Sequence, residues 1–135
     1  ETLPLRIERQ SQNAVRVSEF LENNKNVSKV IYPNDNDKNK KYFKKKLYGN
    51  LIGFHIDKGY EACKTFIDKL KLFYHVANIG DVRSLAIHPS STTHSQLSKE
   101  DQEKAGVFDN YIRLSIGIEH IDDIIDDLSN ALNSI

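Results

Sequence analysis

The sequence has few of the features that would mark it as secreted, membrane-bound or nucleic-acid-binding. Its 135 residues contain one cysteine, so no disulfide can form within the chain and nothing indicates an oxidising compartment. No apolar run approaches the roughly 20 residues that a membrane-spanning helix needs. Basic and acidic residues balance at 19 each, which removes the global electrostatic argument for a nucleic-acid or anionic membrane partner. With no signal-peptide pattern at its start, we expect a cytoplasmic protein.

The sequence also lacks the patterns of common metal and nucleotide sites. Its five histidines do not show the HxxxH or CxxH spacing of metal ligands, so no metal site is expected. The loop at residues 89–95, PSSTTHS, contains no glycine and therefore does not resemble a phosphate-binding P-loop. Methionine is absent, even at position 1, which favours a piece of a longer protein over a complete reading frame.

The apolar pattern predicts one domain in which helices and strands mix. Helical spacing of apolar residues opens the chain for about 20 residues and recurs at 42–47, 60–70 and 121–132. Shorter apolar or alternating runs predict strands at 27–32, 51–56, 72–77, 84–88 and 111–116. Several connections are too short for parallel crossovers. The expected fold class is α/β of the α+β type, with a mostly antiparallel sheet covered by helices.

Two local signals add detail to this pattern. Ser98 and Asp101 have the spacing of a capping box and predict a helix start, and Gly106 suits the end of that helix. Residues 38–46, KNKKYFKKK, carry six lysines. They form either a basic binding patch or the solvated face of a short helix, and the solvated face is the simpler interpretation.

Arg113 is the first candidate for a binding role. Alternation along the predicted strand places Tyr111, Arg113, Ser115 and Gly117 on the face opposite its isoleucines and leucine. A guanidinium beside small polar neighbours can hold a carboxylate with two parallel hydrogen bonds. An ordinary arginine on a solvated sheet face gives the same pattern, so spacing does not decide between the two.

The other polar segments are less specific. Ser84 follows the turn-rich segment 80–83 and could present its amide and hydroxyl to a ligand, although a structural turn fits equally well. The loop at 89–95 is either an ordinary surface loop or the rim of an active site. Cys63 lies on the apolar side of its predicted helix and is expected in the core. No nucleophile elbow accompanies the Ser and His residues of the loop, so no catalytic set is expected within this chain.

Four segments carry a family resemblance, in order along nearly the whole chain. They are residues 1–9 (ETLPLRIER), 59–73 (GYEACKTFIDKLKLF), 76–98 (VANIGDVRSLAIHPSSTTHSQLS) and 105–128 (AGVFDNYIRLSIGIEHIDDIIDDL). The chain resembles the C-terminal domain of the pyridoxal-phosphate (PLP)-dependent enzymes of Cys/Met metabolism. The resemblance implies that residues 1–135 form the two-layer small domain of a fold-type I PLP enzyme, with the large PLP-binding domain absent from this chain.

Within the family, the O-acetylhomoserine sulfhydrylase branch is the most similar. VANIGD at 76–81 and HPSSTTHSQL at 88–97 match the motifs typical of this branch. The basic Arg83 occupies a position at which the lyases commonly have an acidic residue. The resemblance implies a γ-replacement of acetate by sulfide or a thiol, giving homocysteine or methionine. The alternatives are the small domain of a methionine γ-lyase or cystathionine γ-synthase, or a non-catalytic α/β binding module. Gln10 departs from the histidine usual in the branch.

The resemblance also assigns residues. It implies that Arg113 binds the α-carboxylate of the substrate and that Ser84 borders the same carboxylate, with Asn78 and Thr93 as weaker substrate-binding candidates. The family's Schiff-base lysine, phosphate-binding glycines and pyridine-binding aspartate have no counterpart in this sequence. PLP is therefore expected in the full-length enzyme and not on this chain, which should be inactive by itself.

The implied partners follow from the same resemblance. They are the chain's own large domain, an amino-acid substrate, and further copies of the enzyme, since family members commonly form tetramers. Neither a nucleic acid nor a membrane is expected.

Overall fold

A computed structural model describes residues 1–33, 38, 40–43 and 47–135 of the chain. Its elements follow one another as α1 (Leu3–Glu22), β1 (Val27–Ile31), the 3-10 turn η1 (Lys40–Tyr42), β2 (Leu51–Ile56), α2 (Gly59–Lys69), β3 (Leu85–Ile87), the 3-10 turn η2 (Pro89–Ser91), α3 (Lys99–Lys104), β4 (Tyr111–Ser115) and α4 (Ile121–Leu132). The α+β class is as the sequence predicts.

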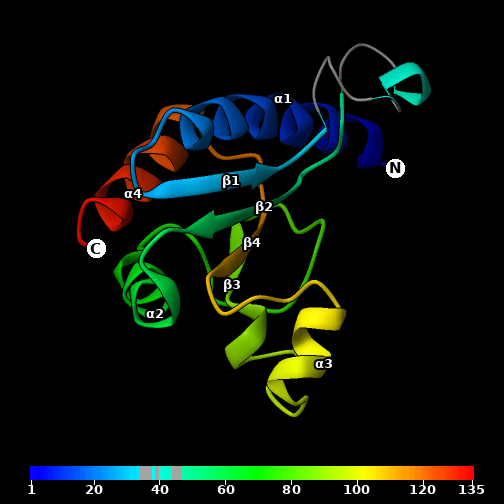
Figure 1. Ribbon diagram of the computed structural model, residues 1–135. Helices are drawn as coiled ribbons and strands as arrows, with labels where there is room; N and C mark the ends of the chain where they lie inside the picture. The colour runs from blue at the N-terminus through cyan, green and yellow to red at the C-terminus, as the bar shows by residue number, and fades with distance from the viewer. Residues whose placement is uncertain (34–37, 39, 44–46) are drawn as a thin grey trace.

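The four strands form one sheet with the order β1-β2-β4-β3, and every neighbouring pair is antiparallel (Figure 1). The central strands β2 and β4 alternate between apolar side chains that face the helices and residues that face away from them. Ile52, Phe54 and Ile56 of β2 are fully buried, as are Ile112 and Leu114 of β4. The predicted antiparallel sheet is therefore confirmed. The side chains of its central strands alternate between a buried face and an open face.

One face of the sheet packs against α1, α2 and α4. Helix α1 contacts β1 and β2, while α4 packs against both α1 and α2. Their inward residues recur at helical spacing and are completely buried, as for Val17 and Leu21 of α1 and Ile124 and Leu128 of α4. Each such aliphatic side chain contributes roughly 1.5–3 kcal/mol by leaving water. Cys63 is fully buried in this layer, which confirms its expected place in the core.

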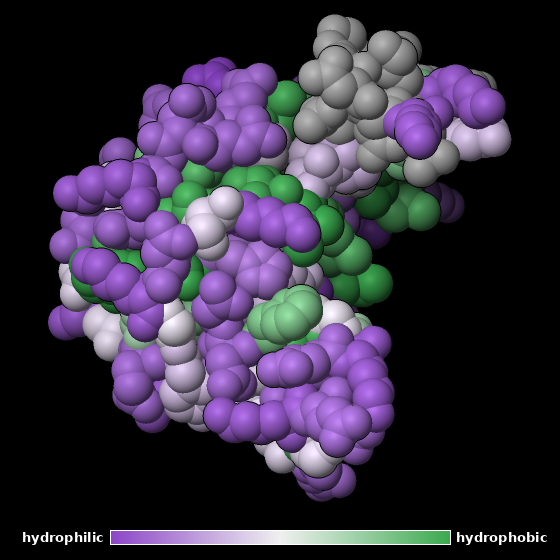
Figure 2. Space-filling model, in the orientation of Figure 1, coloured by the Kyte–Doolittle hydropathy of each residue, from purple (hydrophilic) through white to green (hydrophobic). Residues whose placement is uncertain are grey.

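The opposite face of the sheet is unevenly covered. Near β3 it is closed, since Leu85 and Ile87 are each 2% exposed. Near β1 and β2 it is open, because Ile31 and Leu51 are 46% and 41% exposed. Figure 2 shows apolar surface near the middle of the molecule between hydrophilic regions. The candidate site lies on this face.

The predicted strand at 72–77 is wrong. Within it, Tyr74 forms an isolated bridge with Leu85, and the neighbouring residues form bends and irregular structure. At its start, the carboxylate of Asp127 in α4 accepts hydrogen bonds from the backbone amides of Lys71, Leu72 and Phe73 at 2.9–3.3 Å. Further on, the Val76 amide donates to the Tyr74 carbonyl within the same segment. These amides are therefore unavailable to a strand partner.

The short helices agree with the sequence to different degrees. The predicted helix start is confirmed, since the Ser98 hydroxyl accepts the Asp101 amide, and Gly106 ends the helix region with a φ of 76°. The predicted lysine-bearing helix at 42–47 falls largely outside the described residues. What is described there is the single turn η1.

No helix in the described part of the chain is both long and apolar enough to cross a membrane.

Candidate functional site

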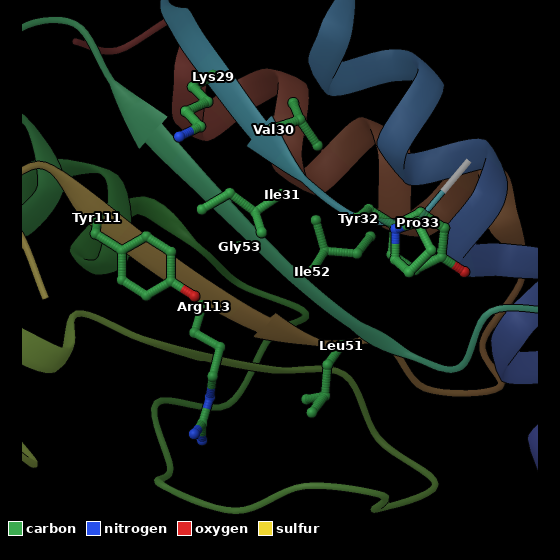
Figure 3. A pocket seen from close by; sticks show the side chains of 10 residues that line it. All are labelled: Lys29, Val30, Ile31, Tyr32, Pro33, Leu51, Ile52, Gly53, Tyr111 and Arg113. Carbon is green, nitrogen blue, oxygen red and sulfur yellow. The ribbon is translucent and has the colours of Figure 1, made fainter. Parts of the chain in front are cut away.

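Arg113 lies in the central strand β4 and points to the open face of the sheet. Its Cα pairs with Gly53 of β2 on one side and with Ile87 of β3 on the other. The Arg113 side chain is half-buried. It extends from the strand past Leu51 toward the loop that carries Asn78 (Figure 3). The alternation read from the sequence therefore assigns Arg113 to the correct face.

Gly53 leaves room beside Arg113 that another residue occupies. The ring of Tyr111, two residues before Arg113 on the same face, lies over Gly53. A Cβ added at Gly53 would fall 2.6 Å from Tyr111 Cε2, closer than any real contact, so the ring position requires glycine. Burial raises the pKa of the Tyr111 hydroxyl against the opposite effect of the Arg113 charge. The hydroxyl is thus a protonated group beside a cation.

A groove of about 570 Å³ runs beside this pair over β1, β2 and β4 (Figure 3). Its lining residues are Lys29, Val30, Ile31, Tyr32, Pro33, Leu51, Ile52, Gly53, Tyr111 and Arg113. The volume is within the range of small-molecule sites, about 300–1,000 Å³. The exposed side chains of Ile31 and Leu51 give the groove an apolar surface, beside the cations Lys29 and Arg113 and the Tyr111 phenol. This lining suits a small ligand bearing an anionic group.

Arg113 has most of its donors available. Its Nη2 donates to the backbone carbonyl of Asn78 at 3.3 Å, and among the described residues no carboxylate pairs with it. A guanidinium carries five N–H donors in a planar fork. Arg113 is thus a fixed cation that can still form two parallel bonds to a carboxylate.

Ser84 is fully buried beside the end of β4 and is not exposed to a ligand. Its amide donates to Glu119 Oε1 at 2.6 Å, and its hydroxyl donates to Glu119 Oε2 at 3.0 Å. The same hydroxyl oxygen accepts the Gly117 amide at 2.9 Å. Both groups that the sequence offered to a ligand are therefore bound by Glu119, and direct substrate binding by Ser84 stays a prediction.

Asn78 and Thr93 differ in their relation to Arg113. Asn78 is exposed and meets Arg113 through its backbone carbonyl, while its side chain accepts the amide of Ile79 at 2.9 Å. Thr93 is exposed, and its hydroxyl bonds the neighbouring His94 Nδ1 at 2.8 Å. Neither residue lines the groove beside Arg113. The structure thus brings Asn78 to Arg113, and a role for Thr93 remains a prediction.

Sequence reasoning assigned no role to two residues that shape this region. Glu119 binds Ser84, as described above, and Asn13 of α1 donates to the backbone carbonyls of Gly117 and Glu119 at 3.1 and 3.0 Å. Asn13 is a buried polar residue on the inward side of a helix, which is a usable signal because such groups require a partner. Glu119 carries no such signal in the sequence.

Comparison with known proteins identifies the family to which this chain belongs. The sequence model of one protein family, described as Cys/Met metabolism PLP-dependent enzyme, matches residues 1–133. The chain belongs to this family. O-acetyl-L-homoserine sulfhydrylase of Leptospira meyeri is 52% identical over 140 aligned residues, covering 100% of this chain and 32% of the relative. L-methionine gamma-lyase of Fusobacterium nucleatum subsp. polymorphum is 38% identical and covers 100% of the chain and 35% of the relative.

A solved family structure has the same fold. A putative O-acetylhomoserine (thiol)-lyase from Campylobacter jejuni, whose crystal structure contains N'-pyridoxyl-lysine-5'-monophosphate, superposes with a TM-score of 0.90 at 46% identity. The match covers 98% of this chain and 32% of the other. The chain thus spans about a third of the length of the family members it matches.

The described residues of this family member do not themselves fit PLP. Strands form the walls of the groove beside Arg113, so it offers neither a helix N-terminus nor a glycine-rich turn for a phosphate group. Its one lysine, Lys29, lies exposed on the edge strand β1. No group of three or more His, Cys, Asp or Glu side chains that could hold a metal ion occurs in the part of the chain that is described. We therefore assign no cofactor contact to this chain.

Proposed function

We propose that the chain is the C-terminal small domain of a PLP-dependent O-acetylhomoserine sulfhydrylase, in which Arg113 binds the α-carboxylate of the amino-acid substrate. The observation that carries the proposal is the state of Arg113. It is a half-buried guanidinium at the border of a groove of about 570 Å³, with a single backbone acceptor and no acidic partner among the described residues. Such a cation keeps donors available for an anion, and the substrate carboxylate would supply one.

The contribution of this chain is to position the substrate. Two parallel hydrogen bonds from Arg113 would fix the plane of the carboxylate, while the apolar strand residues of the groove would contact the rest of the molecule. PLP, bound by the remainder of the enzyme, supplies the electron sink for the reaction. Arg113 orients the substrate toward that remainder and takes no part in breaking bonds. The other proposed partners are the large domain of the full-length enzyme and further copies of that enzyme.

The sulfhydrylase activity is favoured over the lyase activity by two features of the sequence. Residues 76–81 and 88–97 match the sulfhydrylase motifs, and position 83 is basic. The identities agree, since the sulfhydrylase relative is more similar to this chain than the gamma-lyase is. Offering the complete enzyme sulfide or methanethiol together with O-acetylhomoserine separates the two activities. A sulfhydrylase forms the thioether or thiol product, whereas a γ-lyase releases a keto acid whether or not the thiol is present.

The role of Arg113 is tested by substitution in the complete enzyme. We expect Arg113→Ala to raise KM for the amino acid steeply, by about 10- to 100-fold, and to lower kcat as well, because the substrate loses both affinity and orientation. Arg113→Lys keeps the charge but loses the planar fork, so an intermediate effect is expected. Arg16→Lys is the matched control, since Arg16 is exposed on α1. Wild-type kinetics for Arg113→Ala would remove this residue from the substrate site.

A further inference from the structure

Glu119 joins two segments that lie far apart in the sequence. Its carboxylate receives both the amide and the hydroxyl of Ser84, with N–O and O–O distances of 2.6 and 3.0 Å. Bonds from two donors to one carboxylate are charge-assisted and are among the stronger hydrogen bonds in proteins. Glu119 is half-buried, so water competes with these bonds only in part.

The surroundings hold this pair of residues in one geometry. The Gly117 amide donates to the Ser84 hydroxyl at 2.9 Å, and the Ile118 amide donates to the Val82 carbonyl at 2.9 Å. A Cβ at Gly117 would lie 2.5 Å from the Val82 carbonyl oxygen, so the two segments approach as closely as glycine allows. The loop before β3 is therefore fixed against the end of β4.

The loop fixed in this way reaches Arg113. Its Gly80 amide donates to the Ser115 hydroxyl at 3.1 Å, and its Asn78 carbonyl accepts from Arg113 Nη2 at 3.3 Å. The segment from 78 to 84 is thus bonded to β4 and the residues that follow it at Asn78, Gly80, Val82 and Ser84. Because Asn78 provides the acceptor that Arg113 uses, a shift of the loop changes the orientation of the guanidinium.

Helix α1 supports the same loop from the other side. Asn13 Nδ2 donates to the Glu119 carbonyl at 3.0 Å, which holds the backbone of the residue that binds Ser84. Gln10 Nε2 donates to the Asp81 carbonyl at 2.6 Å. Both amide side chains are buried. The glutamine that departs from the usual histidine of the sulfhydrylase branch thus contacts the loop directly.

From these contacts we infer that Glu119 is a positioning residue of the substrate site: by holding Ser84 it fixes the loop at 78–84, and through Asn78 it fixes the direction of Arg113. This inference rests on the proposed carboxylate-binding role of Arg113. The opposite role would have Glu119 compete with a substrate carboxylate for the Ser84 amide. The two roles predict opposite changes in KM when the charge of Glu119 is removed.

The test uses Glu119→Gln in the complete enzyme, with Glu103→Gln as the matched control because Glu103 is exposed on α3. We expect KM for the amino acid to rise about tenfold and kcat to fall by less than in Arg113→Ala. The NH2 group that replaces one carboxylate oxygen cannot accept a hydrogen bond, so one Ser84 donor loses its acceptor, while Arg113 keeps its charge. Glu119→Asp should recover part of the loss. An unchanged KM, or a KM below that of wild type, overturns the inference.

A second measurement uses the 135-residue chain without substrate. In ¹⁵N-labelled protein, the Ser84 amide proton should resonate downfield in the wild type and move upfield in Glu119→Gln, while Glu103→Gln leaves it unchanged. If Glu119→Gln does not fold, Glu119→Asp replaces it, since the shorter carboxylate weakens the same two bonds; a Ser84 amide resonance at its wild-type position in that variant overturns the inference.

The two proposals fail separately. If Arg113→Ala raises KM and Glu119→Gln does not, the positioning role is wrong and the carboxylate site stands. If neither variant changes KM, the proposed function of Arg113 fails, and the positioning role fails with it.

Discussion

At the scale of single residues, the site depends on what is absent next to Arg113. Gly53 has no side chain, so the Tyr111 ring occupies the space above it and the groove continues past both residues. The alternation of β4 places Tyr111 and Arg113 on one face, and the pairing of β2 with β4 places Gly53 between them and β1. A glycine in a central strand costs stability, and here it provides the space that the aromatic ring requires.

Gly53→Ala should therefore destabilise the domain by about 1–3 kcal/mol, because the new methyl group collides with the Tyr111 ring. In a Tyr111→Ala background the same substitution should cost much less, since the colliding ring is gone. Urea unfolding of the wild type, both single variants and the double variant measures this coupling. Equal costs in the two backgrounds would contradict the close packing of the pair.

At the scale of elements, side-chain contacts from helix α4 and from the loop after β3 fix the conformation of segments that lie outside the strands. The carboxylate of Asp127 in α4 binds three consecutive amides at 71–73 and ends any strand there. The loop after β3 is held by His88, which is 1% exposed. His88 Nε2 donates to the Asp109 carbonyl at 2.7 Å, and Nδ1 lies 2.9 Å from the Ser91 hydroxyl. Both contacts suit the neutral ring.

This loop gives the domain a pH dependence. Burial is the main cause that lowers the pKa of His88 below its usual value, and His75 and Lys64 nearby act in the same direction, while Asp109 opposes them. The unfolded chain then binds a proton near pH 6.5 that the folded chain does not bind, so the free energy of unfolding should fall as the pH drops below about 6.5.

The measurement is urea unfolding of the wild type and His88→Gln between pH 7 and pH 5. We expect a shallower dependence of the unfolding free energy on pH for the variant, which has no imidazole to protonate at this position. Asp81 and Asp109 do not obscure this difference. Their pKa values are lowered, so the stability that these carboxylates add is lost at more acidic pH. Parallel slopes for the two proteins would show that His88 titrates alike in the folded and unfolded chain.

At the scale of the whole molecule, the domain is a two-layer structure with one finished face and one open face. Three helices cover one side of the sheet, while the β1 and β2 side of the other face remains exposed around the groove (Figures 1 and 2). The open face carries Arg113, so the proposed substrate contact lies on the side of the sheet that the helices leave uncovered.

We accordingly expect the 135-residue chain to retain no stoichiometric PLP. After incubation with PLP and gel filtration, the chain should show only the weak absorbance of scattered lysine adducts, and it should have no sulfhydrylase activity. The complete enzyme, treated identically, should keep about one PLP per chain, because the proposed function assigns the groups that hold the cofactor to the large domain. Tight, stoichiometric PLP on the chain would contradict this division of roles.

Much of the fold could be predicted from local pattern. The helices at Leu3–Glu22 and Ile121–Leu132 follow from apolar residues at helical spacing, and the strand at Tyr111–Ser115 follows from strict alternation. The segment at 72–77 has the same apolar character as a strand but does not form one. The Val76 amide bonds the Tyr74 carbonyl, and Asp127, more than 50 residues away, takes the amides of Leu72 and Phe73. The spacing of apolar residues contains no information on that contact.

By itself, the sequence determined the family, because contiguous motifs carry it. It also determined which side chains of the central strands face the core and on which face Arg113 lies, because these depend on short-range periodicity. Only the tertiary structure decided that Ser84 binds Glu119, that Tyr111 covers Gly53, and that Asn78 meets Arg113. The first and third of these contacts each join positions 35 residues apart, and the second joins neighbouring strands. Strand pairing and loop closure create them, and both arise only when the whole chain folds.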